Sequence, residues 1–151
     1  METPMLIRRS NGDEQARLRA IAVAAKGRWG YPRAMVDGWA DLDLTDEALA
    51  AKQVFVAEVD GEPVGWASLI RQGEICRLDD LWIDPDWMGR GIGSDLFARA
   101  AEEARSAGAA RMEWESEPNA AGFYAKVGGR YLRDSEPTAF GRVIAVMGVD
   151  V

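Results

Sequence analysis

The sequence predicts a single α/β domain over residues 1–151, built on a mostly antiparallel β-sheet. Three observations predict this fold class. Segments with β-type and helix-type patterning follow one another in the order β, α, α, β, β, β, α, β, α, β, β. Two of the β-rich runs meet at Asp60-Gly61, a pair typical of the tight turn of an antiparallel hairpin. No linker, repeat or low-complexity segment interrupts the chain, so no internal domain boundary is expected.

The first two elements are expected to be a strand and a helix. Residues 5–9 can form a short strand, and Asn11 or Asp13 can cap a helix over about 14–26. Within that helix the apolar residues have helical spacing, at Leu18, Ile21, Ala22 and Ala25. The two glycines, the proline and the aromatic residues of 27–32 then break the helix.

Short helices and then strands follow this break. A second helical stretch is expected near residues 34–39, and Thr45 can cap a further turn of helix. Residues 54–70 form the predicted hairpin, and residues 74–85 form the next strand, which ends at a proline.

The C-terminal part of the chain alternates between helix and strand. Residues 91–107 predict a helix, and Gly108 is expected to end it. One face of this helix is apolar, with Ile92, Leu96, Ala100 and Ala104. The last expected elements are a strand at 110–116, a short helix from Pro118 to Gly128-Gly129, and strands at 130–134 and 142–149.

The composition excludes several classes of function. The chain has no histidine, which excludes Ser-His-Asp and Cys-His catalysis and histidine-bound zinc. Its single cysteine, Cys76, excludes an internal disulfide or a multi-cysteine metal site, and we expect a buried, unreactive thiol. The net charge is −7 and no basic stripe is present, so no nucleic-acid partner is expected. Without an apolar membrane span or a signal-peptide core, a cytoplasmic protein is expected, with no membrane partner and no metal.

The stretch WIDPDWMGRGIGSDL, residues 82–96, places three glycines between an extended apolar segment and a helix. Such a loop lets backbone N–H groups converge on phosphate oxygens beside the partly positive N-terminus of the helix. A Walker loop ends in Gly-Lys-Ser/Thr, where this chain has Gly-Ile-Gly-Ser. The dinucleotide-binding fingerprint G-x-G-x-x-G requires a third glycine at position 94, where this chain has Ser94. A third pattern, Q/R-x-x-G-x-G/A, matches at 88–93 except in its first position.

This third pattern is the acyl-CoA pyrophosphate loop of the GCN5-related N-acetyltransferases (GNAT), a family that residues 77–132 resemble throughout. After the loop come a helix, a strand, Asn119, the pair Phe123-Tyr124 and a Gly-Gly-Arg-Tyr entry to a strand. The resemblance implies the GNAT fold, a mixed, mostly antiparallel sheet of six to seven strands flanked by about four helices, with a splayed central strand pair. Met88 stands where the family usually has Gln or Arg. Since the loop binds phosphate mainly through backbone N–H groups, CoA binding is still expected.

The resemblance implies that acetyl-CoA is the co-substrate and that a primary amine of a small molecule or peptide attacks its thioester directly. Tyr124 matches the family tyrosine that protonates the leaving thiolate, although its ring can also serve only to pack a helix on the core. Lys126 and Arg130 can meet CoA phosphates or be merely solvated. The residues expected to bind the cofactor are Leu81, Trp82, Ile83, Met88, Gly89, Arg90, Gly91, Ile92, Gly93, Ser94, Asn119 and Tyr124.

Two adjacent aspartates are candidates for the base that takes the proton of the amine. Strand alternation predicts that Asp79 and Asp80 point to opposite faces. The run LDDLWI resembles the L-E-D strand of polyamine-type family members, in which the glutamate matches Asp79. Asp79 is therefore the favoured base, directly or through water, and Asp80 is the substrate-facing alternative. Either carboxylate can instead be solvated or paired structurally.

The acceptor site is expected at the junction of the first two helices. Trp29 and Tyr31 can wall an amine, because aromatic faces attract cations, or they can pack over the sheet. Glu113, Glu115 and Glu117 share a strand face and form either an acidic wall for the acceptor or a solvated face. Asp80 and Glu115 complete the predicted acceptor site.

Two other functions stay open at this point. One is a non-catalytic acyl-CoA-binding or regulatory module, and the other is a nucleotide-binding protein of a different kind. A homodimer also stays open, because dimers are frequent in the family.

Overall fold

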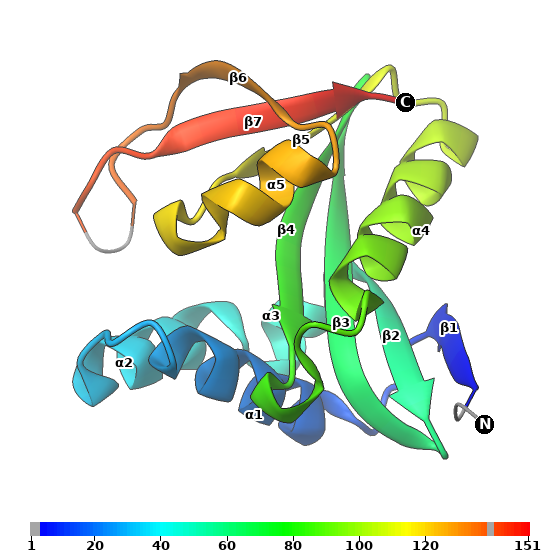
Figure 1. Cartoon of the computed structure of the whole chain (residues 1–151), viewed down its shortest axis with the longest axis vertical. Helices are drawn as coiled ribbons and strands as arrows, with labels where there is room; N and C mark the ends of the chain where they lie inside the picture. Colours follow the sequence, from blue (N-terminus) through cyan, green and yellow to red (C-terminus); the bar gives the residue numbers. More distant parts are fainter. Residues whose placement is uncertain (1–3, 139–140) are drawn as a thin grey trace.

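The computed structural model describes residues 4–138 and 141–151. They form a seven-stranded sheet in the order β1-β2-β3-β4-β5-β7-β6 (Figure 1), in which only β4 and β5 pair in parallel. The strands are β1 (Met5–Arg9), β2 (Gln53–Val59), β3 (Glu62–Gln72), β4 (Ile75–Ile83), β5 (Arg111–Glu115), β6 (Arg130–Asp134) and β7 (Ala145–Asp150). The helices are α1 (Gln15–Gly27), α2 (Arg33–Asp43), α3 (Asp46–Ala50), α4 (Ile92–Ser106) and α5 (Ala121–Lys126), with 3-10 turns η1 (Pro85–Trp87) and η2 (Pro118–Ala120).

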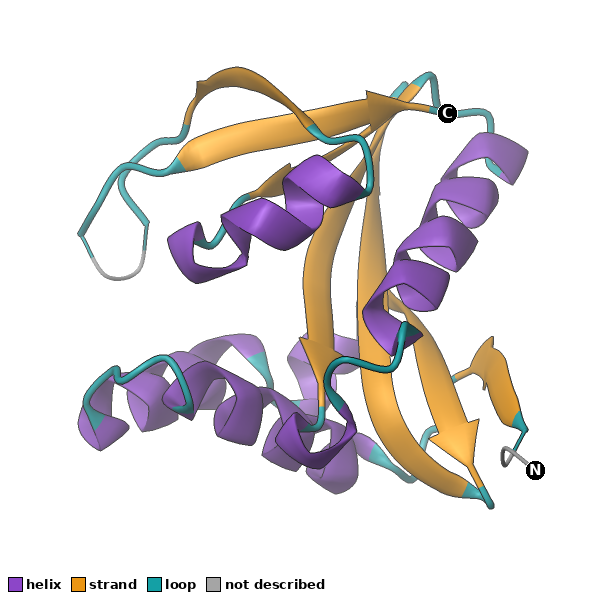
Figure 2. Cartoon of the chain, viewed as in Figure 1, coloured by secondary structure: helices purple, strands orange, loops and turns teal. Residues whose placement is uncertain are grey.

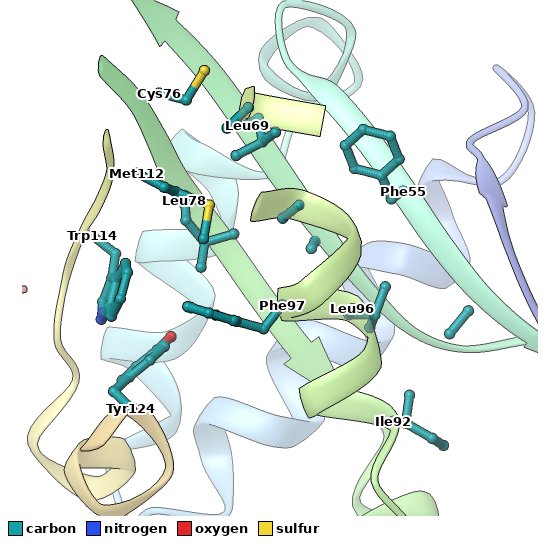
Figure 3. Packing of buried hydrophobic residues seen from close by; sticks show 14 of the residues in the cluster. Phe55, Leu69, Cys76, Leu78, Ile92, Leu96, Phe97, Met112, Trp114 and Tyr124 are labelled. Atoms are coloured by element: carbon teal, nitrogen blue, oxygen red, sulfur yellow. The ribbon is translucent and has the colours of Figure 1, made fainter. Parts of the chain in front are cut away.

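Helices cover both faces of the sheet (Figure 2). The sheet therefore has a hydrophobic core on each face, as two consecutive residues of β2 show. Phe55 packs in the core that contains α4 and α5, and Val56 packs in the core beneath α1 and α2. Figure 3 shows the first core, where Leu96 and Phe97 of α4 meet the sheet. Cys76 lies in this core as expected, and burial raises the pKa of its thiol. No helix in the described part of the chain is long and apolar enough to cross a membrane.

Several local predictions are confirmed by backbone geometry. Asp60 and Gly61 have φ angles of 53° and 80°, the left-handed conformation that the β2–β3 hairpin turn requires. The Thr45 side chain accepts a hydrogen bond of 3.1 Å from the Ala48 N–H and so caps α3. Gly108 follows α4 with a φ of 88°, which ends the helix.

The prediction for the start of α1 was wrong. Neither Asn11 nor Asp13 caps the helix through its side chain. Instead the Glu14 carboxylate accepts a 2.7 Å bond from the Asn11 N–H and two bonds from Arg8 of β1. Helix α2 also continues past the expected end to Asp43, and Ala40 in this extension is buried in the core beneath α1 and α2.

A bulge in β4 overturns the expectation that Asp79 and Asp80 point to opposite faces. Ser68 of β3 pairs with Asp80, but the next residue of β3 pairs with Leu78, so Asp79 is an extra residue in β4. The alternation of side chains between the two faces of the sheet therefore shifts by one residue at the bulge. Leu78 before it and Leu81 after it both face the α4 core. The two carboxylates therefore project to the same side, toward α1 and α2.

The central strands β4 and β5 separate soon after they meet, as the splayed pair of the predicted fold requires. Their parallel pairing covers only Ile75 to Arg77 of β4, although β4 continues to Ile83. One edge of the second half of β4 thus lacks a neighbouring strand. Figure 1 shows α5 and β7 on one side of this divergence and α1 and α2 on the other.

Candidate active site

A cavity of about 590 Å³ lies where β4 and β5 separate. Its walls come from both faces of the sheet. Glycine-loop residues and Phe123 and Tyr124 of α5 line one part, and Trp29, Trp39 and Asp43 of the α1–α2 side line the other. The divergence of the strands therefore joins two half-sites that the sheet would otherwise keep apart.

The glycine loop presents backbone donors to this cavity. Gly89 and Gly91 have φ angles of 77° and 82°, which side chains rarely adopt, and Gly91 precedes the first residue of α4. The N–H groups of the first turn, from Ile92 to Ser94, have no carbonyl acceptor earlier in the helix. Gly93 serves close packing instead, since a Cβ there would lie 3.3 Å from the Phe123 ring. The geometry suits an anion at the start of α4.

The side chains at the head of the loop contribute differently. Met88 lines the cavity and is 37% exposed. The Arg90 guanidinium stacks 4.5 Å from the centre of the Trp87 ring and is not among the residues that line the cavity. The backbone N–H of Arg90 can thus donate to an anion, whereas its side chain stacks on Trp87.

The second half of β4 offers backbone groups along its open edge. The Asp84 N–H donates to Val64 O at 2.8 Å, toward β3. Because successive N–H groups of a strand point to opposite sides, the Ile83 N–H points to the open edge. Leu81, Trp82 and Ile83 all line the cavity; their contact with a pantetheine arm stays a prediction.

Tyr124 is 8% exposed and lines the cavity from α5. Its ring packs 5.0 Å from Trp114 and 5.2 Å from Phe123, and Figure 3 shows it beside Trp114 and Phe97. Burial, together with the charges of Asp80 and Glu117, raises the pKa of the phenol well above its usual value, so it stays protonated. The structure gives its hydroxyl no hydrogen-bond partner among the residues it describes, so the hydroxyl is available to a ligand.

Both aspartates of β4 bind one lysine that the sequence analysis did not identify. Lys52, whose side chain is 8% exposed, contacts Asp79 at 2.7 Å and Asp80 at 2.9 Å. Asp80 also accepts bonds from Ser68 (2.7 Å) and the indole of Trp82 (3.0 Å). Burial lowers the pKa of Lys52, but the two carboxylates outweigh it and the net pKa is raised. The aspartates are therefore paired carboxylates inside the cavity wall.

A second cluster links the α1–α2 junction to the other side of the cavity. Glu117 accepts bonds from the Tyr31 hydroxyl (2.6 Å), Asn119 Nδ2 (2.8 Å) and Arg142 Nη2 (3.0 Å), and Tyr31 also accepts one from Arg142. Asn119 and Glu117 line the cavity, but Tyr31 does not. Tyr31 is thus part of a link across the cleft and not a wall of the predicted acceptor site.

The other glutamates of the predicted acidic wall differ in position. Glu115 lines the cavity and pairs with Arg77 at 3.2 Å. Glu113 does not line it, because two arginines, Arg111 and Arg133, hold its carboxylate at 2.6 Å each. Lys126 lines the cavity, whereas the Arg130 side chain pairs with an exposed aspartate at the C-terminal end of β7.

The side of the cavity formed by α1 and α2 has a wall of aromatic rings, which includes Trp29 but not Tyr31. Trp29 and Trp39 pack 5.9 and 5.2 Å from Trp82, and all three line the cavity. The ammonium of Lys26 lies 4.2 Å from the centre of the Trp39 ring, and burial lowers its pKa. Lys26, Trp39, Lys52 and Asp43 were not identified from the sequence, which carries no local motif around them.

Comparison with known proteins gives one consistent result. A sequence model of the acetyltransferase (GNAT) family matches residues 17–129. An uncharacterised N-acetyltransferase of Methanocaldococcus jannaschii is 38% identical over 84 residues, which cover 49% of this chain and 37% of that protein. The chain spans about half or less of the length of the first curated relatives it matches.

Two solved structures match nearly the whole chain. One, from Rhodopseudomonas palustris, is described as a GCN5-related N-acetyltransferase, aminotransferase class II; it is 25% identical, with a TM-score of 0.83 and coverage of 100% of this chain and 99% of that one. The PaiA N-acetyltransferase of Thermoplasma acidophilum, solved with coenzyme A, is 16% identical, with a TM-score of 0.83 and coverage of 98% and 99%. At that identity the second likeness shows the fold alone.

Proposed function

The chain belongs to the acetyltransferase (GNAT) family, and from this premise we propose that it transfers the acetyl group of acetyl-CoA directly to a primary amine of a small molecule or peptide. One observation carries the proposal. A single cavity connects a glycine loop suited to pyrophosphate with a buried, protonated Tyr124 and a wall of carboxylates and aromatic rings. The coenzyme A bound by the structurally similar PaiA protein supports the same choice of cofactor.

In this proposal the cofactor occupies the half of the cavity between α4 and α5. The N–H groups of the loop and of the first turn of α4 bind the pyrophosphate, and Ser94 lines the cavity there. The open edge of β4 binds the pantetheine arm, and the Ile83 N–H stabilises the oxyanion that develops on the thioester. Asn119 contacts the arm from η2.

The acyl transfer needs no covalent enzyme intermediate. The neutral amine attacks the thioester carbon, so that a C–N bond forms while the C–S bond breaks. Tyr124 gives its proton to the departing CoA sulfur, for which a phenol that is protonated at neutral pH is suited. Tyr124 is then reprotonated from solvent.

The proton of the attacking amine leaves by way of water in this proposal. Both oxygens of Asp79 and both of Asp80 already accept bonds from side chains of the protein. Direct transfer to either carboxylate would have to displace part of that network. We therefore propose that Asp79 and Asp80 orient a water molecule that takes the proton and passes it to solvent.

The first test is calorimetric titration of the full chain with acetyl-CoA. Ser94→Glu places a carboxylate where the pyrophosphate is proposed to bind, and Ala98→Glu adds the same charge one turn later on exposed surface of α4. We expect native protein and Ala98→Glu to bind, and folded Ser94→Glu to lose at least about tenfold in affinity, roughly 1.4 kcal/mol.

Absence of binding by the native chain would overturn the proposal. Binding without turnover on a broad panel of primary amines would instead favour the non-catalytic acyl-CoA-binding module. A cytoplasmic location stays a prediction of the sequence, and a homodimer stays open.

A further inference from the structure

Asp43, the last residue of α2, differs from the other carboxylates of the cavity wall. Asp79, Asp80, Glu115 and Glu117 each form an ion pair with a lysine or arginine. Asp43 lines the same cavity at an exposed position, and it forms no hydrogen bond or ion pair with any residue that the structure describes. The two lysines whose charges reach it are engaged elsewhere, Lys52 with the β4 aspartates and Lys26 over the Trp39 ring.

The position of Asp43 separates it from the reacting atoms. Tyr124 and the glycine loop line one part of the cavity, and Asp43 lines the part on the side of α1 and α2. Asp43 lies instead beside Trp39, four residues earlier on the same face of α2, in the aromatic part of the cavity. It thus faces the portion of an acceptor that lies beyond its reacting amine.

The charge of Asp43 fits a cation better than it fits the nucleophile. An amine must be neutral to attack a thioester, and a carboxylate beside it would favour the unreactive ammonium form. A non-reacting cation has no such conflict. Burial raises the pKa of Asp43 and the charge of Lys52 lowers it, but with the smaller effects of Asp79, Asp80 and Lys26 the net pKa is raised. A cation bound here offsets the cost of keeping this carboxylate ionised. The ammonium of Lys26 already lies over the Trp39 and Trp82 rings, which leaves Trp29 as the aromatic face of the cavity that can attract this cation.

We infer that the acceptor carries a second positive charge besides its reacting amine, and that Asp43 binds this charge against the tryptophan wall of the cavity. The inference rests on the proposed function and adds a substrate class to it: amines with a cationic group at a distance, as opposed to simple alkyl amines.

The test compares two acceptors that differ only in charge. The first is an aminobutyl compound with a trimethylammonium group at its far end, and the second carries an uncharged tert-butyl group of the same shape. Each has a single reactive amine. We expect the native chain to acetylate the cationic compound with a kcat/KM about tenfold higher, equal to about 1.4 kcal/mol.

Asp43→Asn should remove this preference. It should raise KM for the cationic compound about tenfold, with kcat nearly unchanged, and leave the uncharged compound unaffected, because Asp43 contacts only the non-reacting end. Asp46→Asn is the matched control: it removes the same charge three residues later, at a residue that, like Asp43, is exposed and unpaired among the described residues, but does not line the cavity. A merely structural role for Asp43 would change both compounds alike.

The outcomes separate this inference from the proposed function. Turnover of both compounds with equal kcat/KM by the native chain would overturn the inference and leave the acetyltransferase proposal intact. If neither compound is acetylated, calorimetry can instead measure how the cationic compound binds to the complex of the protein with acetyl-CoA. Loss of that binding in Asp43→Asn supports the inference, and equal binding by both proteins overturns it. Failure to bind acetyl-CoA at all would be a failure of the proposed function, seen in the first titration.

Discussion

At the scale of single residues, Tyr124 combines a packed ring with a hydroxyl that is free for a ligand. Tyr124→Phe keeps the ring against Trp114 and removes only the proposed acid. We expect kcat to fall by about 10²-fold or more, because general acid catalysis contributes roughly that much. The melting temperature and the affinity for acetyl-CoA should stay close to native, as circular dichroism and calorimetry would show.

Tyr131→Phe is the control for this prediction, because Tyr131 is exposed on β6 and its hydroxyl bonds only Asp134. Both variants lose one phenolic oxygen, but only Tyr124 lines the cavity. An unchanged kcat in Tyr124→Phe would remove Tyr124 from the mechanism and leave it a packing residue.

Lys52 holds two negative charges inside the protein. Lys52→Met should lower the free energy of unfolding by about 3–5 kcal/mol, the usual cost of removing one partner of a buried ion pair. Adding Asp80→Asn to this variant should recover part of the loss, since Asp80 has lost its ion pair with Lys52 whereas Asp79 keeps the one with Arg77. Urea unfolding of the single and double variants checks both expectations, and a loss below about 1 kcal/mol in Lys52→Met would show that the pair is not important for stability.

The sequence predicted residues that lie in local motifs and missed those that depend on tertiary contacts. The glycine loop and Tyr124 belong to recognisable patterns, and both line the cavity. Lys52 and Asp43 stand alone in the sequence. Lys52, just before β2, reaches the β4 aspartates only in the folded chain, and Asp43 lines the cavity from the end of α2. No local pattern marks such a meeting.

At the scale of elements, Gly129 allows α5 to pack closely on β5 and β7. A Cβ at this position would lie 2.7 Å from Trp114 Cζ2 and 2.8 Å from the Tyr124 carbonyl oxygen. Gly129→Ala should therefore cost about 1–3 kcal/mol and displace Tyr124. Gly122→Ala, in open space on the same helix, should be neutral or stabilise by about 0.5–1 kcal/mol. Denaturant unfolding of the two variants makes the comparison, and equal effects would contradict it.

The elements themselves were largely predictable, but the register of β4 was not. Period-two patterning identified the strand, and the Asp-Gly pair identified the preceding hairpin. A strand bulge changes the side to which every later residue points, and it leaves no clear mark in a run such as LDDLWI. The bulge is what places Asp79 and Asp80 together on Lys52, so the missed register was also a missed feature of the site.

At the scale of the whole molecule, Glu117 joins segments that lie far apart in the chain. It bonds Tyr31 between α1 and α2, Asn119 in η2 and Arg142 before β7. Burial alone would raise the pKa of Glu117, but these bonds outweigh burial and its pKa is lowered. The link across the cavity thus depends on an ionised carboxylate.

This dependence predicts how acid affects stability. A carboxylate whose folded pKa is depressed contributes stability above its unfolded pKa, about 4.3 for Glu, and loses it as the pH falls through the lower folded value. The native free energy of unfolding should therefore fall more steeply below about pH 5 than that of Glu117→Gln. At neutral pH Glu117→Gln should be the less stable protein. Glu62→Gln removes an exposed carboxylate of the β2–β3 turn and should leave the native pH profile unchanged in shape. Parallel profiles for native protein and Glu117→Gln, measured by urea unfolding at a series of pH values, would show that the link does not depend on the charge of Glu117.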